Sequence, residues 1–190
     1  EAPGARRADD IAREAITGVH SRRWLERHLD CLGKSQLDGA IVMCDIDRFK
    51  SVNDSYGHHV GDDVLREFAE VVNSAAGSGV VARFGGEEFI VVFPDADRAD
   101  ATGHLDEVRV RLARVLASGD VPAYTVSGGV SDTTLTAEFS EMVAMADAAL
   151  YRAKRDGRDR IVTHDSVVAE APEVILSIPP MPKIPSMAAE

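Results

Sequence analysis

The sequence lacks the features that mark several large protein classes. It has two cysteines in 190 residues, Cys31 and Cys44, too few for a disulfide framework or a thiolate zinc site, so a reducing cytoplasm is expected. No stretch of about eighteen apolar residues occurs, so no membrane-spanning helix is predicted. The chain begins at Glu1 with neither a signal-peptide pattern nor a methionine, and we therefore expect that an upstream segment is missing.

Positive charge is also scarce. The chain carries 32 acidic against 21 basic residues, a net charge of −11. Such a surface repels the phosphates of DNA and RNA and of anionic lipid, so we expect no nucleic-acid partner and no membrane contact by this domain. A nucleotide remains compatible, because a small polyphosphate needs only a few local cations and usually brings magnesium with it.

Familiar catalytic motifs are missing too. There is no GxxxxGK[ST] loop and no GxGxxG after a strand, which argues against P-loop and Rossmann nucleotide sites. No Gly-x-Ser-x-Gly elbow indicates a hydrolase. The pair His58-His59 has no HExxH pattern or cysteine partner nearby, so no structural metal is predicted there.

The apolar residues that are present recur at helical and strand spacings. The helical spacing predicts helices over about 21–32, 60–72, 101–115 and 139–153. The strand patterns cover 39–45, 80–84, 88–93, 124–130 and 160–163. A glycine pair between the second and third strands predicts a tight hairpin. The order α-β-α-β-β-α-β-α-β indicates an α+β sandwich with ferredoxin-like logic, in which helices flank a mixed central sheet.

The two ends of the chain differ in composition from its middle. Residues 1–13 are small, charged and aperiodic, and are interpreted as a linker or the end of a signalling helix. Residues 165–190 are rich in Ala, Glu, Val and Pro, which predicts an extended or disordered tail. The folded domain is therefore expected over residues 14–164.

Two acidic clusters flank the predicted sheet. Asp45 and Asp47 follow a buried strand, and residues two apart on a strand share a face, so the pair is well placed to hold a hard cation. Glu87 and Glu88 follow the glycine pair at the hairpin, where one of them can point toward the same ion. Solvated strand-end acids and a plain surface hairpin are the alternatives for each cluster taken alone.

Cations lie near both clusters. Lys50 follows the first acidic pair, and Lys154 and Arg158 are four residues apart at the end of the last helix. That spacing places both side chains on one helical face if the helix persists. Partners of the helix dipole are the alternative for these two residues.

Taken in order, these stretches resemble the GGDEF domain of diguanylate cyclases, in its GGEEF variant, across residues 14–163. The motifs that carry the resemblance are Thr17-Gly18, Arg22-Arg23, Asp45-Ile-Asp-Arg-Phe-Lys50, Asn53-Asp-Ser-Tyr-Gly-His58, Gly61-Asp62, Ala82-Arg-Phe-Gly-Gly-Glu-Glu-Phe89, Thr125-Val-Ser-Gly128, and Ala146-Asp-Ala-Ala-Leu-Tyr-Arg-Ala-Lys154 with Gly157-Arg158. The resemblance implies a nucleotidyl-cyclase-type fold with an added hairpin. It also implies an enzyme that condenses two GTP molecules into cyclic di-GMP and two pyrophosphates.

The resemblance assigns catalytic and metal-binding roles. Two Mg²⁺ or Mn²⁺ ions per active site would be held by Asp45, the carbonyl group of Ile46 and Glu87. Glu87 would also be the base, Glu88 a supporting acid, and Lys50 a catalytic cation on the triphosphate.

It also assigns substrate contacts. The substrate-binding residues would be Asn53, His58, Asp62, Gly85, Gly86, Lys154 and Arg158. Among these, Asn53 and Asp62 would bind the guanine edge, since a carboxylate accepts hydrogen bonds from its ring NH and amino group. Lys154 and Arg158 would bind the triphosphate, and the glycine pair would leave room for the nucleotide.

Because one domain holds one GTP, the resemblance implies a homodimer with the reaction at its seam. It further implies an upstream sensory or regulatory segment and a cytoplasmic catalytic domain. A catalytically weak GGDEF domain that binds GTP or a dinucleotide as a regulatory module is the alternative. The complete set of polar site residues favours the enzyme.

The chain departs from the family pattern at several positions. Ala76-Gly-Ser-Gly79 stands where the family's inhibitory Arg-x-x-Asp is found, which predicts no product inhibition through that site. Asp159 replaces an Asn beside the phosphate-binding cations, so slightly weaker binding is expected. Glu14 replaces the Asp that opens the first motif. The base-reading Asp62 is retained, which predicts selectivity for GTP over ATP.

Overall fold

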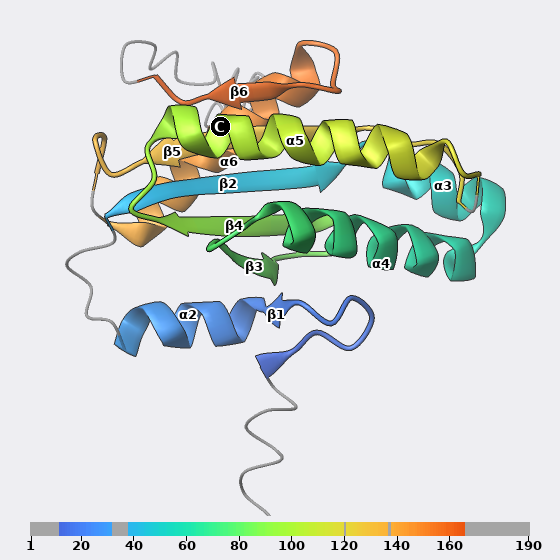
Figure 1. The fold of residues 1–190 in the computed structure, drawn as a ribbon, viewed down its shortest axis with the longest axis horizontal. Helices are drawn as coiled ribbons and strands as arrows, with labels where there is room; N and C mark the ends of the chain where they lie inside the picture. The colour runs from blue at the N-terminus through green and yellow to red at the C-terminus, as the bar shows by residue number, and fades with distance from the viewer. Residues whose placement is uncertain (1–11, 32–37, 120, 137, 166–190) are drawn as a thin grey trace, which may run out of the picture.

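A six-stranded mixed sheet forms the centre of the chain (Figure 1). The computed structural model describes residues 12–31, 38–119, 121–136 and 138–165. The strands are β1 (His20–Ser21), β2 (Gly39–Ile46), β3 (Val80–Arg83), β4 (Glu88–Pro94), β5 (Val126–Asp132) and β6 (Ile161–Thr163). Their spatial order is β1-β3-β4-β2-β5-β6, with antiparallel pairs in the middle and parallel pairs at both edges. The predicted α+β fold class is confirmed.

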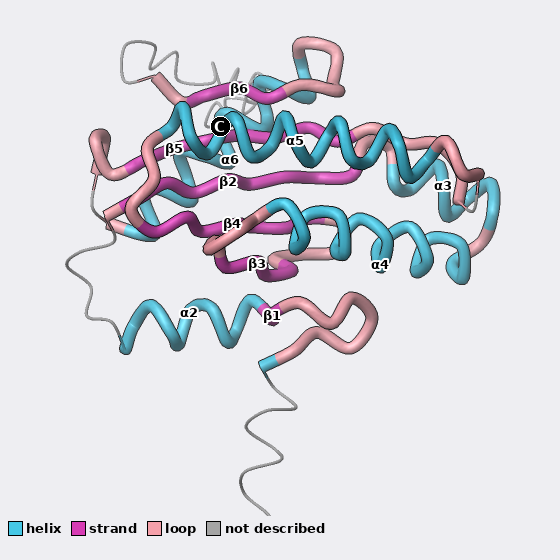
Figure 2. The backbone as a smooth tube through the Cα atoms, in the orientation of Figure 1, coloured by secondary structure: helices cyan, strands magenta, loops and turns pink. Residues whose placement is uncertain are grey.

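Helices cover both faces of this sheet, as the tube in Figure 2 makes plain. They are α2 (Arg22–Cys31), α3 (Phe49–Tyr56), α4 (His58–Ala75), α5 (Arg98–Leu116) and α6 (Phe139–Arg155). In Figure 1, α4 and α5 lie in front of the sheet and α6 lies behind it. Among the described residues, no helix has the length and apolar composition needed to cross a bilayer.

Alternation along β2 divides the core in two. Val42, Cys44 and Ile46 face a cluster formed with α4 and α5, whereas Ile41 and Met43 face a second cluster formed with α6. All eight residues of β2 are buried, so β2 is covered on both faces and is not an amphipathic strand. This central strand is the element on which the other segments are assembled.

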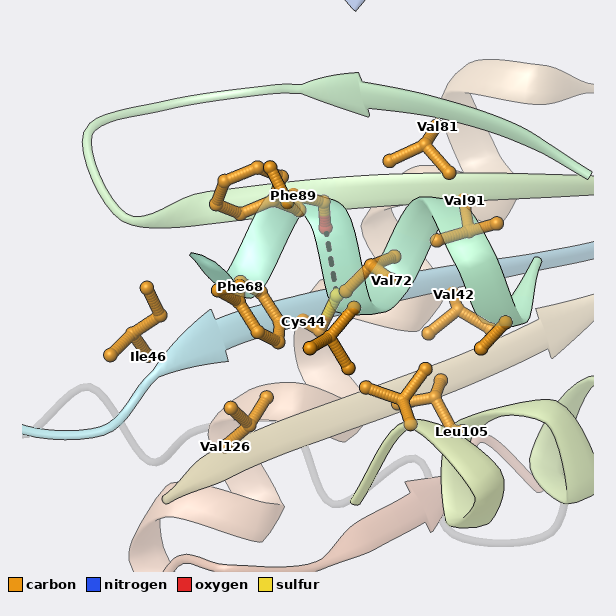
Figure 3. Close-up of a cluster of buried hydrophobic side chains, with 14 of the residues drawn as sticks. Val42, Cys44, Ile46, Phe68, Val72, Val81, Phe89, Val91, Leu105 and Val126 are labelled. Atoms are coloured by element: carbon orange, nitrogen blue, oxygen red, sulfur yellow. Dashed lines mark hydrogen bonds between the residues drawn. The ribbon is translucent and has the colours of Figure 1, made fainter. Parts of the chain in front are cut away.

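The larger cluster is drawn in Figure 3. Phe68 of α4 meets Phe89 of β4 edge to face, with ring centroids 5.0 Å apart, an arrangement that aromatic pairs favour. The thiol of Cys44 donates to the carbonyl oxygen of Phe89 at 3.5 Å. Burial raises the pKa of the Cys44 thiol, which keeps it protonated. Cys44 is therefore a small core residue, as expected for an apolar strand.

Two elements were not predicted. The helix α3 buries only Phe49 and Val52, too few apolar positions to display a period. The strand β1 has two residues, and it is recognisable only by its parallel pairing with β3. The predicted linker and tail lie almost wholly outside the described residues.

The hairpin predicted at the glycine pair is present between β3 and β4. Phe84 donates its backbone N–H to the carbonyl oxygen of Glu88 at 2.8 Å, so the loop is wider than a two-residue turn. Neither Gly85 nor Gly86 has a positive φ, whereas the turn expected from a glycine pair needs positive φ at both central positions. The two hairpin glycines are therefore not needed for a positive φ. Their lack of a side chain leaves room for neighbouring groups.

One glycine sets the distance between α6 and the sheet. A Cβ atom on Gly129 of β5 would lie 2.0 Å from the carbonyl oxygen of Ala146 and 2.3 Å from the backbone nitrogen of Leu150. The helix therefore rests on β5 backbone to backbone. Gly103, in contrast, is exposed on α5, and a Cβ atom there meets nothing within 4 Å.

We predict that Gly129→Ala lowers the free energy of unfolding by roughly 1–3 kcal/mol or more, because α6 must move away from the sheet. The same chemical change in Gly103→Ala should raise it by about 0.5–1 kcal/mol, because alanine is the better helix former. Urea denaturation followed by circular dichroism measures both. Equal effects of the two substitutions would contradict the close approach of α6.

Candidate active site

A buried carboxylate stands at the carboxyl end of β2. Asp45 is 5 % exposed and is the register partner of Glu88, at the start of β4. Glu87 is the preceding residue, and its carbonyl oxygen accepts the backbone N–H of Ile46 at 3.3 Å. The two acidic clusters that are 42 positions apart in the sequence, at Asp45 and at Glu87, therefore meet where the hairpin enters the sheet.

The charge of Asp45 is balanced by a lysine from α6. Lys154 Nζ lies 2.7 Å from Asp45 Oδ2. Burial raises the pKa of Asp45 to about 6, the Lys154 ammonium acts in the opposite direction, and the charges of Glu87 and Glu88 add to the increase. Three acids and one lysine thus form a single electrostatic unit.

Asp47 has a different role from Asp45, although the sequence pattern treats the two alike. Its carboxylate accepts hydrogen bonds from Thr125 Oγ1 and Ser127 Oγ, both at 2.7 Å, and from the backbone N–H of Asp159 at 3.1 Å. Arg158 Nε approaches it to 4.0 Å. Asp47 therefore ties the end of β2 to β5 and to the turn after α6, and it is not free to coordinate an ion beside Asp45.

An arginine organises the hairpin. Arg83 Nη2 donates to the carbonyl oxygen of Gly86 at 2.6 Å, and Nε donates to the carbonyl oxygen of Gly85 at 3.2 Å. The same guanidinium pairs with Glu14 Oε1 at 2.9 Å. Glu14 in turn accepts from Thr17 through its other oxygen. These roles of Arg83 and Glu14 were not predicted, although Arg83 stands directly before the hairpin in the sequence.

The two hairpin glycines leave different spaces. A Cβ atom on Gly85 would lie 2.6 Å from Glu88 Oε2, so glycine is needed there for the carboxylate to keep its place. A Cβ atom on Gly86 would meet nothing within 4 Å. Gly86 thus faces open space at the edge of the acidic unit, where a ligand can approach the backbone closely.

The residues expected to bind the guanine lie at the corner between α3 and α4. Asn53 Oδ1 lies so close to Gly61 that a Cβ atom on Gly61 would be 2.0 Å away. Asp62, the next residue, is half-buried, whereas Lys50 and His58 are exposed near the starts of α3 and α4. Gly57, with φ +86°, turns the chain between the two helices. Asn53 and Asp62 thus reach one corner from two helices.

The phosphate-binding candidates meet at the sheet end by different routes. A shared helical face for Lys154 and Arg158 was expected only if the helix persists. The helix α6 ends at Arg155, so the two residues do not share one. Arg158 instead follows a turn with positive φ and lines a cleft of about 490 Å³ together with Asp47, Arg48 and Tyr124. Lys154 and Arg158 still face neighbouring acids, Asp45 and Asp47.

The donors at this sheet end fit a hard divalent cation. Asp45, Glu87 and Glu88 offer carboxylate oxygens, which Mg²⁺ and Mn²⁺ prefer. Burial raises the pKa of Asp45, and the charges of Glu87 and Glu88 add to the increase. In the part of the chain that the structure describes, no three acidic, histidine or cysteine side chains are grouped closely enough to hold a metal ion. Lys154 supplies the positive charge next to Asp45 in this arrangement.

Comparison with known proteins gives consistent matches. The family described as "Diguanylate cyclase, GGDEF domain" matches residues 11–160. Diguanylate cyclase DgcM of Escherichia coli (strain K12) is 39% identical over 155 residues, covering 78% of this chain and 37% of the relative. Response regulator PleD of Caulobacter vibrioides (strain NA1000 / CB15N) is 35% identical over 159 residues, covering 78% of this chain and 35% of the relative. The chain thus spans about a third of the length of these curated relatives.

Solved structures agree with the sequence matches. The GGDEF domain of DgcB from Caulobacter crescentus, in complex with c-di-GMP, superposes with a TM-score of 0.69 at 31% identity, covering 83% of this chain and 98% of that one. The diguanylate cyclase SiaD from Pseudomonas aeruginosa, in complex with its activator SiaC, superposes with a TM-score of 0.69 at 35% identity, covering 83% of this chain and 64% of that one.

We predict that the free energy of unfolding includes a contribution from Asp45 that decreases as the pH rises from about 4 to about 6. The folded chain holds the proton of Asp45 up to a pKa of about 6, whereas the ordinary value is 3.8, so between these values folding takes up a proton. Urea denaturation at several pH values, compared between the wild type and Asp45→Asn, isolates this contribution. A difference between the two proteins that does not change with pH would contradict the raised pKa.

Proposed function

The chain belongs to the GGDEF family of diguanylate cyclases, and we propose that it condenses two GTP molecules into cyclic di-GMP with release of two pyrophosphates. The observation that carries the proposal is the convergence of Asp45, Glu87 and Glu88 beside Lys154 at one end of the sheet. A purely structural domain has no need for a buried carboxylate that pairs with a lysine and lies beside two further glutamates, because removing such charges from water opposes folding.

Guanine recognition is assigned to the corner between α3 and α4. Asn53 and Asp62 are the only pair of proposed contacts there that combine an amide with a carboxylate, and the guanine edge offers a matching acceptor and two donors. The close approach of Asn53 Oδ1 to Gly61 supports this assignment, because it places the amide beside the residue that precedes Asp62. His58 is a further substrate contact in the proposal. This arrangement favours GTP over ATP.

The triphosphate is assigned to Lys50, Lys154 and Arg158. These residues lie at the start of α3, near the end of α6 and in the turn after α6. Lys50 and Lys154 would stabilise the charge that develops as pyrophosphate leaves. Arg158 would bind a phosphate group equally in the ground state and in the transition state. Lys154 is then shared between Asp45 and the substrate.

Glu87 is proposed as the base that takes the proton from the attacking 3′-hydroxyl, with Glu88 as its supporting acid. Asp45, the carbonyl group of Ile46 and Glu87 would hold two Mg²⁺ or Mn²⁺ ions. Such ions orient the phosphate and neutralise the leaving group. Because the domain offers one guanine site, the attacking hydroxyl comes from a GTP held by a second copy, and we propose a homodimer with the reaction at its seam.

We predict that purified protein converts GTP into cyclic di-GMP in the presence of Mg²⁺ or Mn²⁺, and that Glu87→Gln reduces the rate by about 100-fold or more, because the base is lost. Chromatography of the products measures both proteins. Glu70→Gln, an exposed glutamate on α4, is the matched control and should keep the wild-type rate. GTP binding without product from the wild type would favour a regulatory, non-catalytic domain instead.

Insensitivity to product through the family's inhibitory position is also part of the proposal. Ala76-Gly-Ser-Gly79 carries neither charge of the Arg-x-x-Asp pattern, and a Cβ atom on Gly79 would lie 2.9 Å from the ring of Phe93. The adjoining cleft, of about 600 Å³, is acidic, with Asp95, Asp100 and Glu107 among its lining residues. Such a surface repels an anionic dinucleotide.

We predict that added cyclic di-GMP slows the reaction only by competing with GTP at the active site. Initial rates measured at several concentrations of product and substrate should show inhibition that disappears at saturating GTP. Inhibition of unchanged strength at saturating GTP would reveal a separate product site and contradict this part of the proposal.

A further inference from the structure

The turn that presents Arg158 has an unusual backbone. After the end of α6, Gly157, Arg158 and Asp159 have φ values of +115°, +67° and +46°. The backbone N–H of Arg158 donates to the carbonyl oxygen of Ala153 at 3.0 Å, a common way to end a helix, and glycine at 157 suits it. Two further non-glycine residues in the left-handed region are unfavourable, and they persist only where neighbouring groups hold them.

Asp159 is held at three of its groups. Its backbone N–H donates to Asp47 Oδ2 at 3.1 Å. Arg109 of α5 donates to its carbonyl oxygen through Nη2 at 3.0 Å, and to its Oδ1 through Nη2 at 2.9 Å and Nε at 3.3 Å. The contact spans 50 sequence positions. One guanidinium therefore grips both the side chain and the main chain of Asp159.

This grip differs from an ordinary surface ion pair. Arg109 also approaches Asp106 of its own helix at 3.5 Å, a pair of the kind that contributes little. The bond to the main-chain carbonyl oxygen of Asp159, however, fixes the peptide group between Asp159 and Arg160, at the end of the turn that presents Arg158. It also offsets the negative charge of Asp159, which lies beside the phosphate-binding candidates.

We propose that Arg109 is a positioning residue: by fixing the left-handed turn at Asp159, it holds the side chain of Arg158 in the cleft, ready to bind a phosphate group of the nucleotide. The inference rests on the proposed function, because it assigns the phosphate to Arg158. Asp47 holds the inner side of the turn and Arg109 holds the outer side. Without Arg109, the turn relaxes and Arg158 samples other directions.

The first experiment measures steady-state formation of cyclic di-GMP from GTP. Arg109→Ala should raise KM for GTP roughly five- to tenfold and change kcat by less than about twofold, because a uniform binding contact is loosened. Arg109→Lys should recover part of the loss, because an ammonium still reaches the carbonyl oxygen of Asp159. Arg111→Ala is the matched control: Arg111 lies on the same helix and pairs with Glu107 and Ser74, and its loss should leave KM unchanged.

A double-mutant cycle separates positioning from general destabilisation. In the Arg158→Ala background, Arg109→Ala should add less than about a twofold change in KM, because the side chain that it positions is gone. The proposal would be overturned if the KM changes of the two single variants multiplied in the double variant. A wild-type KM in Arg109→Ala would also overturn it.

Hydrogen exchange tests the turn independently of catalysis. Peptides that cover residues 156–161 should exchange faster in Arg109→Ala than in the wild type and Arg111→Ala, because the relaxed turn opens the bond from the backbone N–H of Asp159 to Asp47 more often. Unchanged exchange there would sink the inference even in an active enzyme. If the wild type made no cyclic di-GMP while exchange rose as expected, the proposed function would fail and the grip on the turn would stand.

Discussion

The buried carboxylate of Asp45 is the constraint on which the site depends. A negative charge at the end of a fully buried strand is unfavourable unless a cation compensates for it. Lys154 provides that compensation, and the two glutamates of the hairpin partly oppose it by repelling the carboxylate of Asp45. This arrangement favours the binding of a further cation, because a positive charge near the three acids reduces their mutual repulsion. The fold serves this balance by bringing β2, the hairpin and α6 together.

Much of the fold is predictable from the chain because its apolar pattern is strong. The apolar run in β2 and the helical spacing of apolar residues in α4, α5 and α6 are enough to locate these elements in the sequence. The short helix α3 was missed because its register comes from packing on α4 and not from its composition. The turn geometry of the hairpin was also missed, since Arg83 supplies the bonds that a tighter turn makes internally.

The site is predictable in kind but not in detail. The sequence places Asp45 and Asp47 in one motif, and only the structure separates the acid that faces Lys154 from the one that ties β5 to the turn after α6. Arg109 carries no local signal at all, because its partner lies 50 residues away. Residues that hold another residue in place depend on tertiary contacts, which spacing alone does not encode.

The absence of a side chain at Gly129 reaches further than its own strand. The helix α6 rests directly on the backbone of β5 at Ala146 and Leu150. The position of its last turn therefore depends on the close contact at Gly129. A side chain at position 129 would push α6 away from the sheet and would move the ammonium group of Lys154 away from Asp45. Gly129, which has no functional group, therefore determines how closely the charge of Lys154 on α6 approaches the end of β2.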